Sequence, residues 1–507
     1  MQSSSSQATS HLLRVTDTDR PFTRDFKDLF STLMVSLKLE TNRSFFAKYE
    51  YSFTSEQALS NLSSLKFLQS SRIPDPNDPS RIVITTTATT FSMSRDVALS
   101  ICQHFVQARF IDPVGGRNSN GGATFVAKGG LYQMTTKGIA VLQRFCARNG
   151  ITARHVLDII ESPRNSMRLL ILERNLATDR LLTDSATVEV IFRRFAGQDG
   201  PNIIPGLSLA SSSSSLAAAR KIPRQPGYPN GVLGVRLAKD QRINGKTFTY
   251  VFSGRTAADW LMDCCTTIDE REPYAIGALF VLHRLVVLAR DDPDYRPSRG
   301  NGDAPFIPTD TALYAITPEG QAVCGWKYLS PTGEVTPPNS GSFDTPREGA
   351  DSNKARLRYI LNDPSLRLLF REFLIASFCE ENLSFYLELS EFMDDYAALK
   401  ATKQLADPSM IRRTFATAYG MYNTFLASGS PCELNIEHSL RRNLAIKITL
   451  AMREQSPDEQ CLDEVLALFK AVQTYIFHLM ASDSVPKFFI VPRYTGILQQ
   501  HDFESVR

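Results

Sequence analysis

The feature that most constrains the fold of this chain is an internal repeat in its first two thirds. Residues 131–135 (LYQMT) match residues 313–317 (LYAIT), and residues 51–55 (YSFTS) match residues 250–254 (YVFSG). Between these matched ends, each copy carries an apolar helical pattern that runs into a short strand-like tip. Because the patterns recur in the same order, the sequence predicts two winged-helix-like α+β modules, each with a small helical core covered by a β-wing.

Composition breaks divide the chain into segments. Stretches rich in serine, proline and glycine cannot bury enough apolar surface to offset the entropy of ordering, so they are typical of linkers and disordered ends. The breaks predict a disordered N-terminus (1–20), a first module (21–150), a helical connector (151–199), a linker (200–230), a second module (231–329), a linker (330–350), a C-terminal domain (351–491) and a polar tail (492–507).

Charge and hydropathy exclude several classes of protein. Lys and Arg number 56 against 53 Asp and Glu, which gives no electrostatic case for nucleic-acid binding, and the helical pattern at 274–289 is too apolar for a recognition helix. The longest apolar run, 278–289, contains His283 and Arg284 and is too short for a membrane span. The N-terminus lacks the pattern of a secretory signal, so we expect a cytoplasmic protein without a transmembrane segment.

The sequence contains no motif typical of a catalytic, nucleotide-binding or metal-binding site. The glycine cluster at 115–122 lacks the strand and helix context of a nucleotide fingerprint, and residues 245–247 (GKT) lack the first glycine of a P-loop. The eight cysteines include no CxxC pair and stand mostly inside apolar periodic segments, which is typical of reduced core residues. We therefore expect no catalytic residue, no metal site and no cofactor.

The second module resembles a DEP domain. The residues that carry the resemblance are Phe252, Gly254, Asp259, Trp260, Leu261 and Tyr314. The first module resembles a divergent DEP domain, with no Trp at the position of Trp260 and an insertion rich in Pro and Thr at 73–90. The resemblance implies recruitment to a receptor's cytoplasmic tail or to anionic lipid at the plasma membrane. Arg284, Arg290 and Arg296 could serve such contacts, and solvated surfaces explain them equally well.

The C-terminal domain has helical periodicity almost throughout. Asp363 and Pro364 form an N-cap and N1 pair ahead of an apolar stripe. A second stripe continues for nearly six turns towards the end of the domain, through Leu462, Val465, Leu466, Phe469, Val472, Ile476 and Met480. Several such helices joined by short polar loops predict an all-α bundle, so the chain as a whole is expected to be mainly α.

Three segments of this bundle resemble RGS domains, the regulators of G-protein signalling. They are 373–386 (FLIASFCEENLSFY), 433–438 (ELNIEH) and 478–488 (HLMASDSVPKF). The resemblance implies binding to a GTP-loaded G-protein α subunit and faster GTP hydrolysis by it. It places the contacts at Phe378, Glu381, Asn382, Glu433, Asn435, Glu437, His438, Leu479, Asp483, Ser484 and Lys487. Tandem DEP modules ahead of this domain resemble fungal RGS proteins that desensitise pheromone or developmental signalling.

Some positions depart from the family pattern. Phe378 stands where many members have Tyr, His438 where Ser is frequent, and Lys487 where Arg is frequent. Lys presents a point charge in place of the planar fork of Arg, which weakens a bidentate contact.

Each contact residue also has a purely structural interpretation. Glu381 and Asn382 could cap a helix, Asp483 and Ser484 could form an N-cap, Asn435 could be a turn residue, and Phe378 and Leu479 could be core residues. Their joint occurrence in order on one helical domain favours the functional interpretation. The alternative function is a scaffold that binds a G protein or receptor without accelerating hydrolysis.

Overall fold

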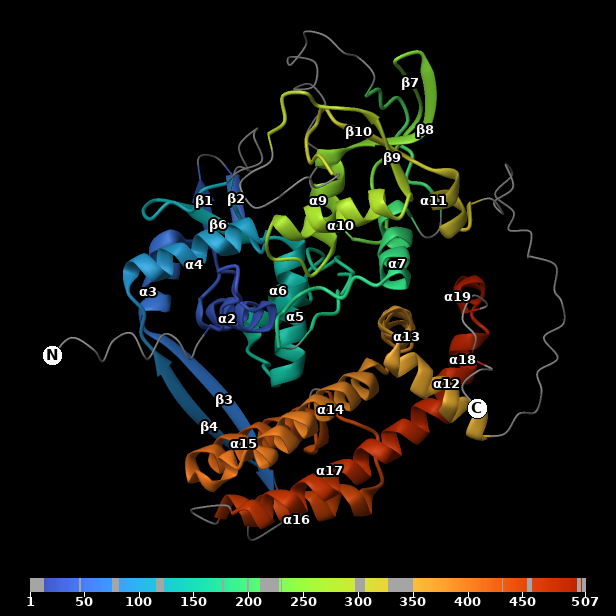
Figure 1. Ribbon diagram of the computed structural model, residues 1–507. Helices are drawn as coiled ribbons and strands as arrows, with labels where there is room; N and C mark the ends of the chain where they lie inside the picture. Colours follow the sequence, from blue (N-terminus) through green and yellow to red (C-terminus); the bar gives the residue numbers. More distant parts are fainter. Residues whose placement is uncertain are drawn as a thin grey trace. The chain divides into compact units, whose positions relative to one another are not determined.

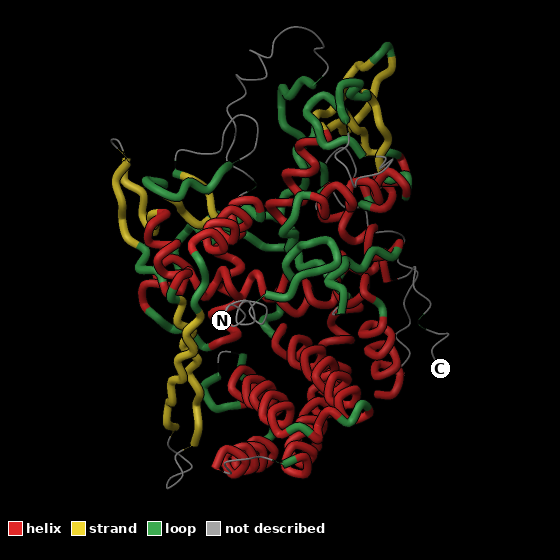
Figure 2. Tube along the Cα trace, turned by 60° about the vertical axis from the view of Figure 1, so that its left-hand side comes forward, coloured by secondary structure: helices red, strands yellow, loops and turns green. Residues whose placement is uncertain are grey.

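The structure is a computed structural model of the 507-residue chain. It describes residues 13–498 and 503 outside the segments 45–46, 75–81, 115–122, 176, 198–199, 210–227, 229, 297–305, 327–349, 431 and 454–457. The chain divides into two compact units. The first comprises residues 1–65, 91–143 and 153–343, and the second comprises residues 66–90, 144–152 and 344–507. Strands are confined to two small sheets and one ribbon, and helices make up most of the remaining secondary structure (Figure 2).

The first module is built as the repeat predicts, with helices around a small antiparallel sheet (Figure 1). Its elements are α2 (Thr23–Ser36), β1 (Glu40–Ser44), β2 (Ala47–Thr54), α3 (Ser55–Ser63), α4 (Arg95–Gln107), β5 (Ile111–Pro113), β6 (Leu131–Met134) and α5 (Thr136–Asn149). The insertion predicted at 73–90 belongs to a separate two-stranded ribbon of β3 (Leu65–Pro74) and β4 (Ile82–Phe91). The β-branched residues of β4 favour this extended conformation.

The second module repeats this plan. Its elements are α7 (Ser185–Ala196), β7 (Ala238–Ile243), β8 (Lys246–Ser253), α9 (Gly254–Cys264), α10 (Arg271–Leu282), β9 (Val286–Arg290), β10 (Leu313–Ile316) and α11 (Pro318–Val323). The strand orders β1-β2-β6-β5 and β7-β8-β10-β9 are the same topology. The matched tyrosines also make the same bond: Tyr132 accepts from the Val126 amide at 2.8 Å, and Tyr314 from the Ile307 amide at 2.7 Å.

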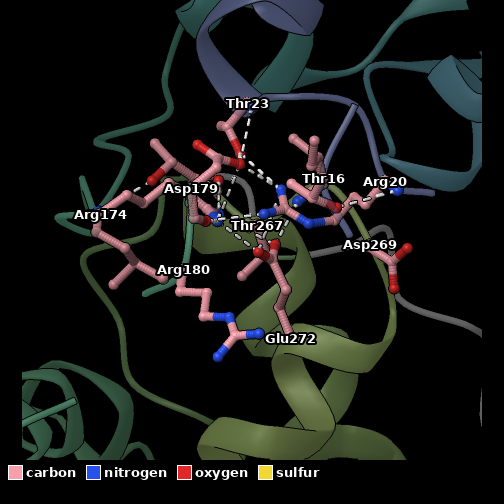
Figure 3. A network of polar contacts seen from close by, with 12 residues as sticks. Thr16, Arg20, Thr23, Arg174, Asp179, Arg180, Thr267, Asp269 and Glu272 are labelled. Carbon is pink, nitrogen blue, oxygen red and sulfur yellow. Dashed lines mark hydrogen bonds and ion pairs between the residues drawn. The ribbon is translucent and has the colours of Figure 1, made fainter. Parts of the chain in front are cut away.

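The residues predicted to be a disordered N-terminus are ordered from residue 13 to residue 20. Arg20 is nearly buried and lies 2.6 Å from a carboxylate oxygen of Asp179, to which Thr23 also donates (Figure 3). Arg174 completes the network by donating to Glu272 at the start of α10, at 2.5 Å. A buried charge is tolerated only when it is paired, so this network fixes the N-terminal segment in place. The prediction of disorder is wrong for these residues.

The predicted helical connector is helical only at its ends, in α6 (Arg154–Ile160) and α7. The described residues between 161 and 184 contain no helix, although their apolar side chains follow a helical spacing. The backbone of Leu170 instead pairs with the second module: its amide donates to the Cys264 carbonyl at 2.8 Å, and its carbonyl accepts from Thr266 at 3.0 Å. Tertiary pairing therefore overrides the local periodicity.

The predicted linkers are only partly described. Most of the stretch 200–230 and almost all of 330–350 lie outside the described residues. Residues 200–209 pack against the second module, since Ile204 donates to the Leu237 carbonyl at 3.0 Å and Leu209 donates to Gln241 at 2.8 Å. This part of the first predicted linker is therefore structured.

Two cations join the modules. Arg109 of the first module donates to Asp263 of α9 at 2.7 Å and pairs with Asp259, one turn away on the same helix. Lys137 is 2 % exposed, and its ammonium group donates to the carbonyls of Met262 and Thr267 at 2.5 and 2.6 Å. Both cations therefore hold α9 against the first module.

The C-terminal domain is the predicted helical bundle. Its helices are α12 (Ala350–Asn362), α13 (Pro364–Ala376), α14 (Glu380–Ala401), η2 (Gln404–Ala406), α15 (Pro408–Met421), α16 (His438–Arg453), α17 (Glu459–Leu479), α18 (Val485–Phe489) and α19 (Pro492–Leu498), with π-turns η3 (Tyr422–Leu426) and η4 (Met480–Ser484). Asp363 caps α13 as expected, and the apolar stripe of α17 is buried. The predicted polar tail begins with α19, whose Tyr494 and Leu498 are 3 and 5 % exposed, so this part of the tail is structured.

The stretch Glu459–Phe489 is long and apolar enough to cross a membrane by length and composition alone. Core helices of a bundle meet the same criteria. Its apolar stripe faces the bundle interior, and its exposed face carries Asp463 and Glu464, which pair with Lys400 and Lys447. This arrangement is that of a core helix.

We expect Arg109→Ala to destabilise the first unit by about 2–3 kcal/mol, because the partly buried Asp263 loses its partner and Asp259 keeps only Arg255, while solvent screens part of the loss. Urea denaturation measures this through tryptophan fluorescence, since both tryptophans of the chain, Trp260 and Trp326, lie in the first unit. Arg284→Ala at the equivalent turn of the second module is the control. Arg284 is exposed, so its loss should change stability by less than about 0.5 kcal/mol.

Lys137 makes the stability of the first unit depend on pH. Burial lowers the pKa of its ammonium group to about 7, against 10.5 without burial. Between these two pH values the unfolded chain binds one more proton at Lys137 than the folded chain does. Raising the pH therefore stabilises the folded state, by up to about 1.4 kcal/mol for each pH unit. Below pH 7 both states are protonated and this contribution no longer changes.

The measurement is the urea midpoint of tryptophan fluorescence across this pH range, compared between the wild type and Lys137→Met. The variant should lose the rise that the wild type shows between about pH 7 and 10. Parallel curves for the two proteins would show that Lys137 does not titrate in this window.

Candidate functional site

The first predicted contact loop joins α13 to α14. Phe378 stands at its tip with a φ of +56° and is 94 % exposed. The Cys379 amide donates to the Leu374 carbonyl at 3.0 Å, which closes the end of α13. A left-handed residue at this position is usually Gly, because a side chain costs about 1–2 kcal/mol there. The loop therefore presents a large aromatic side chain on a strained backbone.

Glu381 and Asn382 lie in the first turn of α14. Burial raises the pKa of the half-buried Glu381 carboxyl group, and the neighbouring Glu380 raises it further. Asn382 is only 7 % exposed, and its Oδ1 has no hydrogen-bond partner among the residues that the structure describes. Neither side chain caps the helix, since its N-cap is Cys379 without a side-chain bond.

The second loop precedes α16 and is extended. Leu434 and Ile436 point inward and are 0 and 7 % exposed, whereas Asn435 and Glu437 between and after them are exposed. The Leu434 amide donates to the Phe425 carbonyl in η3 at 2.9 Å, which anchors the loop to the bundle. This alternation directs the Asn435 side chain outward.

Two acidic residues of this loop are already engaged. Glu433 accepts from the Gly429 amide at 2.7 Å and pairs with Arg441 of α16, which also donates to the Leu434 carbonyl at 2.7 Å. Glu437 accepts from the Ser439 hydroxyl at 2.7 Å. Glu433 therefore shapes the loop through Arg441, a residue that the sequence did not single out because nothing local marks this pair. His438 is exposed at the start of α16.

The third segment is the π-turn η4 and the short helix α18. Asp483 and Lys487 are exposed and form an ion pair at 2.6 Å, Ser484 is 5 % exposed, and Leu479 is half-buried. The Ser484 side chain makes no capping bond, which argues against a role as a helix cap. The wider turn of a π-helix re-aims the residues that follow it, and such turns are frequent at functional sites.

The three segments converge at one end of the bundle. Burial raises the pKa of the Cys379 thiol in the first loop, and the carboxylates of Glu381 and Asp483 raise it further, whereas Lys487 and a hydrogen bond with Ser484 lower it. The hydrogen bond between Cys379 and Ser484 brings the first loop into contact with the third segment. The ring of Phe370 in α13 also packs on the ring of Phe488 in α18, with the two ring centroids 5.2 Å apart.

The second loop lies beside α14. Burial raises the pKa of the Cys432 thiol to about 11, with further increases from carboxylates of α14 that include Glu381. Phe385 of α14 packs against Phe425 of η3 at 5.5 Å, and η3 in turn anchors the second loop. The end of the bundle therefore presents Phe378, Asn435 and Asp483 from three separate segments.

Comparison with known proteins identifies the family. Residues 356–496 match the regulator of G protein signaling domain. Over 99 % of its length the chain is 52 % identical to the "Developmental regulator flbA" of Emericella nidulans and covers 67 % of that protein. The chain belongs to the fungal RGS proteins. It is also 29 % identical to "Regulator of G-protein signaling 1" of Schizosaccharomyces pombe, over 95 % of this chain and 92 % of that protein.

The RGS domain by itself has animal relatives. The chain is 31 % identical over 134 residues to human "Regulator of G-protein signaling 10", which is 26 % of this chain and 59 % of that protein.

The comparison corrects one prediction about this RGS protein. Residues 235–316 match the DEP domain, as the second module was expected to do. Residues 25–162 match the fungal-differentiation regulator winged helix domain, so the first module is not a second DEP domain. The two modules share one topology, and a repeat of topology does not distinguish between these families. The missing Trp and the insertion at 73–90 are the departures from the DEP pattern that the sequence of the first module shows.

We expect Phe378→Gly to keep or raise the stability of the RGS domain, by about 0–1 kcal/mol. Gly relieves the left-handed strain, and the almost fully exposed ring contributes no burial that could be lost. Calorimetry of the full chain measures the change in the second unit. A loss above about 1 kcal/mol would show that the Phe378 ring packs on the protein.

Proposed function

We propose that the RGS domain accelerates GTP hydrolysis by a heterotrimeric G-protein α subunit and so limits receptor signalling. The observation that carries this proposal is the convergence of three segments that expose Phe378, Asn435 and Asp483 at one end of the bundle. The matched family model and the two fungal relatives support it.

The mechanism follows from what a slow GTPase lacks. An α subunit carries its own arginine for the charge that develops in phosphoryl transfer, so the partner need not supply one. It must hold the mobile switch loops in their transition-state arrangement, because only binding that favours this state lowers the barrier. A strained and well-anchored loop suits this role, since little of it has to be ordered upon binding.

Individual residues take distinct parts in this proposal. Asn435 has both a donor and an acceptor and can orient a polar switch residue without adding charge. Glu381 and Asp483 accept hydrogen bonds from switch amides or cations. Asn382 holds a buried acceptor without a partner, which costs about 1–3 kcal/mol, so docking that supplies a donor would be favourable.

We predict that Asn435→Ala reduces the acceleration of GTP hydrolysis by about tenfold or more, because a contact made in the transition state is lost. The measurement is single-turnover hydrolysis on a GTP-loaded Gi-type α subunit, with the full chain added. Asn443→Ala is the matched control, since Asn443 is also exposed but lies in the second turn of α16.

Two other outcomes separate the alternatives. If the full chain binds the GTP-loaded α subunit but does not change its rate, the domain is a scaffold. If it neither binds nor accelerates any of several α subunits, the proposal of a GTPase-activating function fails. Equal effects of the two Asn variants would remove Asn435 from the contact surface.

We further propose that the DEP domain recruits the protein from the cytoplasm to the plasma membrane, at a receptor's cytoplasmic tail or at anionic lipid. The DEP match supports this role. The similarity to a developmental regulator supports a function in fungal development, such as growth, sporulation or the pheromone response.

A further inference from the structure

The same strained turn joins helix to wing in both modules of the first unit. Arg109, between α4 and β5, has a φ of +59°, and Arg284, between α10 and β9, has a φ of +57°. In each turn a Thr hydroxyl fixes the arginine carbonyl: Thr135 donates to Arg109 at 2.6 Å and Thr317 to Arg284 at 2.7 Å. Because the backbones agree, the two arginine side chains leave equivalent positions.

In the first module this turn binds a helix. Arg109 bridges Asp259 and Asp263, which stand one turn apart on α9. Lys137 donates to the carbonyl of Met262 in the last turn of the same helix and to that of Thr267, three residues beyond its end. The turn and Lys137 together therefore bind a pair of carboxylates and the carbonyls at the end of the helix.

In the second module the equivalent turn has no occupant in the described part of the chain. Arg284 is exposed, and its side chain makes no hydrogen bond or ion pair with any residue that the structure describes. The turn lies where α10 leads into β9, the edge strand of its sheet (Figure 1). A strained residue without a structural partner indicates a functional role.

The preceding helix α7 does not fill this place. It packs as α2 does in the first module: Phe26 of α2 lies 5.0 Å from Phe105, and Phe192 of α7 lies 5.0 Å from Phe280. Phe105 and Phe280 both stand four residues before the turn arginine. Helix α7 is therefore the equivalent of α2. The surface of the second module that is equivalent to the α9-binding surface of the first is a different one, which α7 does not cover.

The surroundings of Arg284 are more apolar than those of Arg109. Leu282, Val287 and Leu288 are 65, 44 and 37 % exposed. The strand registers assign Asp112 and Pro113 as the counterparts of Val287 and Leu288, and the position before the turn assigns Gln107 as that of Leu282. Val287 and Leu288 are consecutive on β9 and point to opposite faces of the sheet, so at most one of them shares a surface with Arg284. Exposed apolar side chains beside a charged residue are typical of a protein interface.

One charge is inverted between the copies. The helix after the wing carries Lys137 at its second position in the first module and Glu319 at its second position in the second. Glu319 is exposed. A helix that binds there must bring a cation where α9 brings its terminal carbonyls, because a carboxylate repels a helix C-terminus.

We propose that the Arg284 surface, formed by Leu282, Arg284, Glu319 and one exposed face of β9, binds an amphipathic helix of a partner protein. This helix carries two carboxylates one turn apart, an apolar face and a Lys or Arg at its end. A second copy of α9 is a poor occupant, because Arg109 of its own chain already holds its carboxylates. The inference rests on the recruitment role of the DEP domain and names the chemistry of its partner.

The experiment measures binding of two labelled, stapled helical peptides to the full chain by fluorescence anisotropy. The first has Asp at positions i and i+4, leucines beside them and a terminal Lys. The second has the charges reversed, with two Lys and a terminal Glu. We expect saturable binding of the first peptide and binding at least about tenfold weaker of the second.

Arg284→Glu should weaken binding of the acidic peptide by about tenfold or more and strengthen binding of the reversed peptide. Arg242→Glu is the control, since Arg242 is exposed on β7, at the opposite edge of the same sheet. Unchanged tryptophan fluorescence shows that each variant folds. Arg284→Glu should also leave the acceleration of GTP hydrolysis in solution unchanged, which separates this inference from the GTPase-activating function.

Three results would overturn the inference. They are no binding of the acidic peptide, equal binding of both peptides, and equal effects of Arg284→Glu and Arg242→Glu. Vesicles of phosphatidylserine and phosphatidylcholine test the other class of partner. If they bind through Arg284 while neither peptide does, the surface recognises anionic lipid and not a helix.

Discussion

Buried basic side chains of the first module and of the N-terminal segment hold the first unit together. Lys137 reaches two carbonyls of the second module, Arg109 reaches two of its carboxylates, and Arg20 joins the N-terminal segment to the network around Glu272 (Figure 3). A buried ion pair adds little net stability over apolar packing, but breaking it leaves an uncompensated charge. These contacts therefore act by specifying one arrangement of the modules. They fix α9 in place and leave exposed the turn of the DEP domain at Arg284, between α10 and β9.

Much of this fold could be predicted, because the repeat and the apolar stripes are local patterns. The order of elements in both modules and the buried face of α17 follow from them. The failures occur where a distant partner decides the conformation. Leu170 lies in a stretch with helical spacing of apolar residues but pairs with Cys264. Arg20 belongs to a polar segment, and the carboxylate that it binds, that of Asp179, is 159 residues away. No local rule contains such information.

The candidate site shows the same division. Its residues were named from the sequence, and the structure brings Phe378, Asn435 and Asp483 to one end of the bundle. Their surroundings were not foreseeable. The left-handed backbone of Phe378 depends on how α13 ends, and Glu433 is directed to Arg441 by the turn between them. The sequence therefore predicted that three separate segments contribute to one surface, and it missed how the backbone and Arg441 position their side chains.

The two modules share the same backbone arrangement but use it for different contacts. Tyr51 and Tyr250 adopt the same left-handed conformation, with φ values of +53° and +54°, as do Arg109 and Arg284. The backbone is thus preserved where the side chains have diverged. In the first module the turn is used inside the chain, because α9 carries the two carboxylates that Arg109 needs. The counterparts of Asp259 and Asp263 on α3 are Ser60 and Ser64, so the first module offers no such pair in return. The contact is therefore one-directional, and the equivalent turn of the second module remains exposed to solvent.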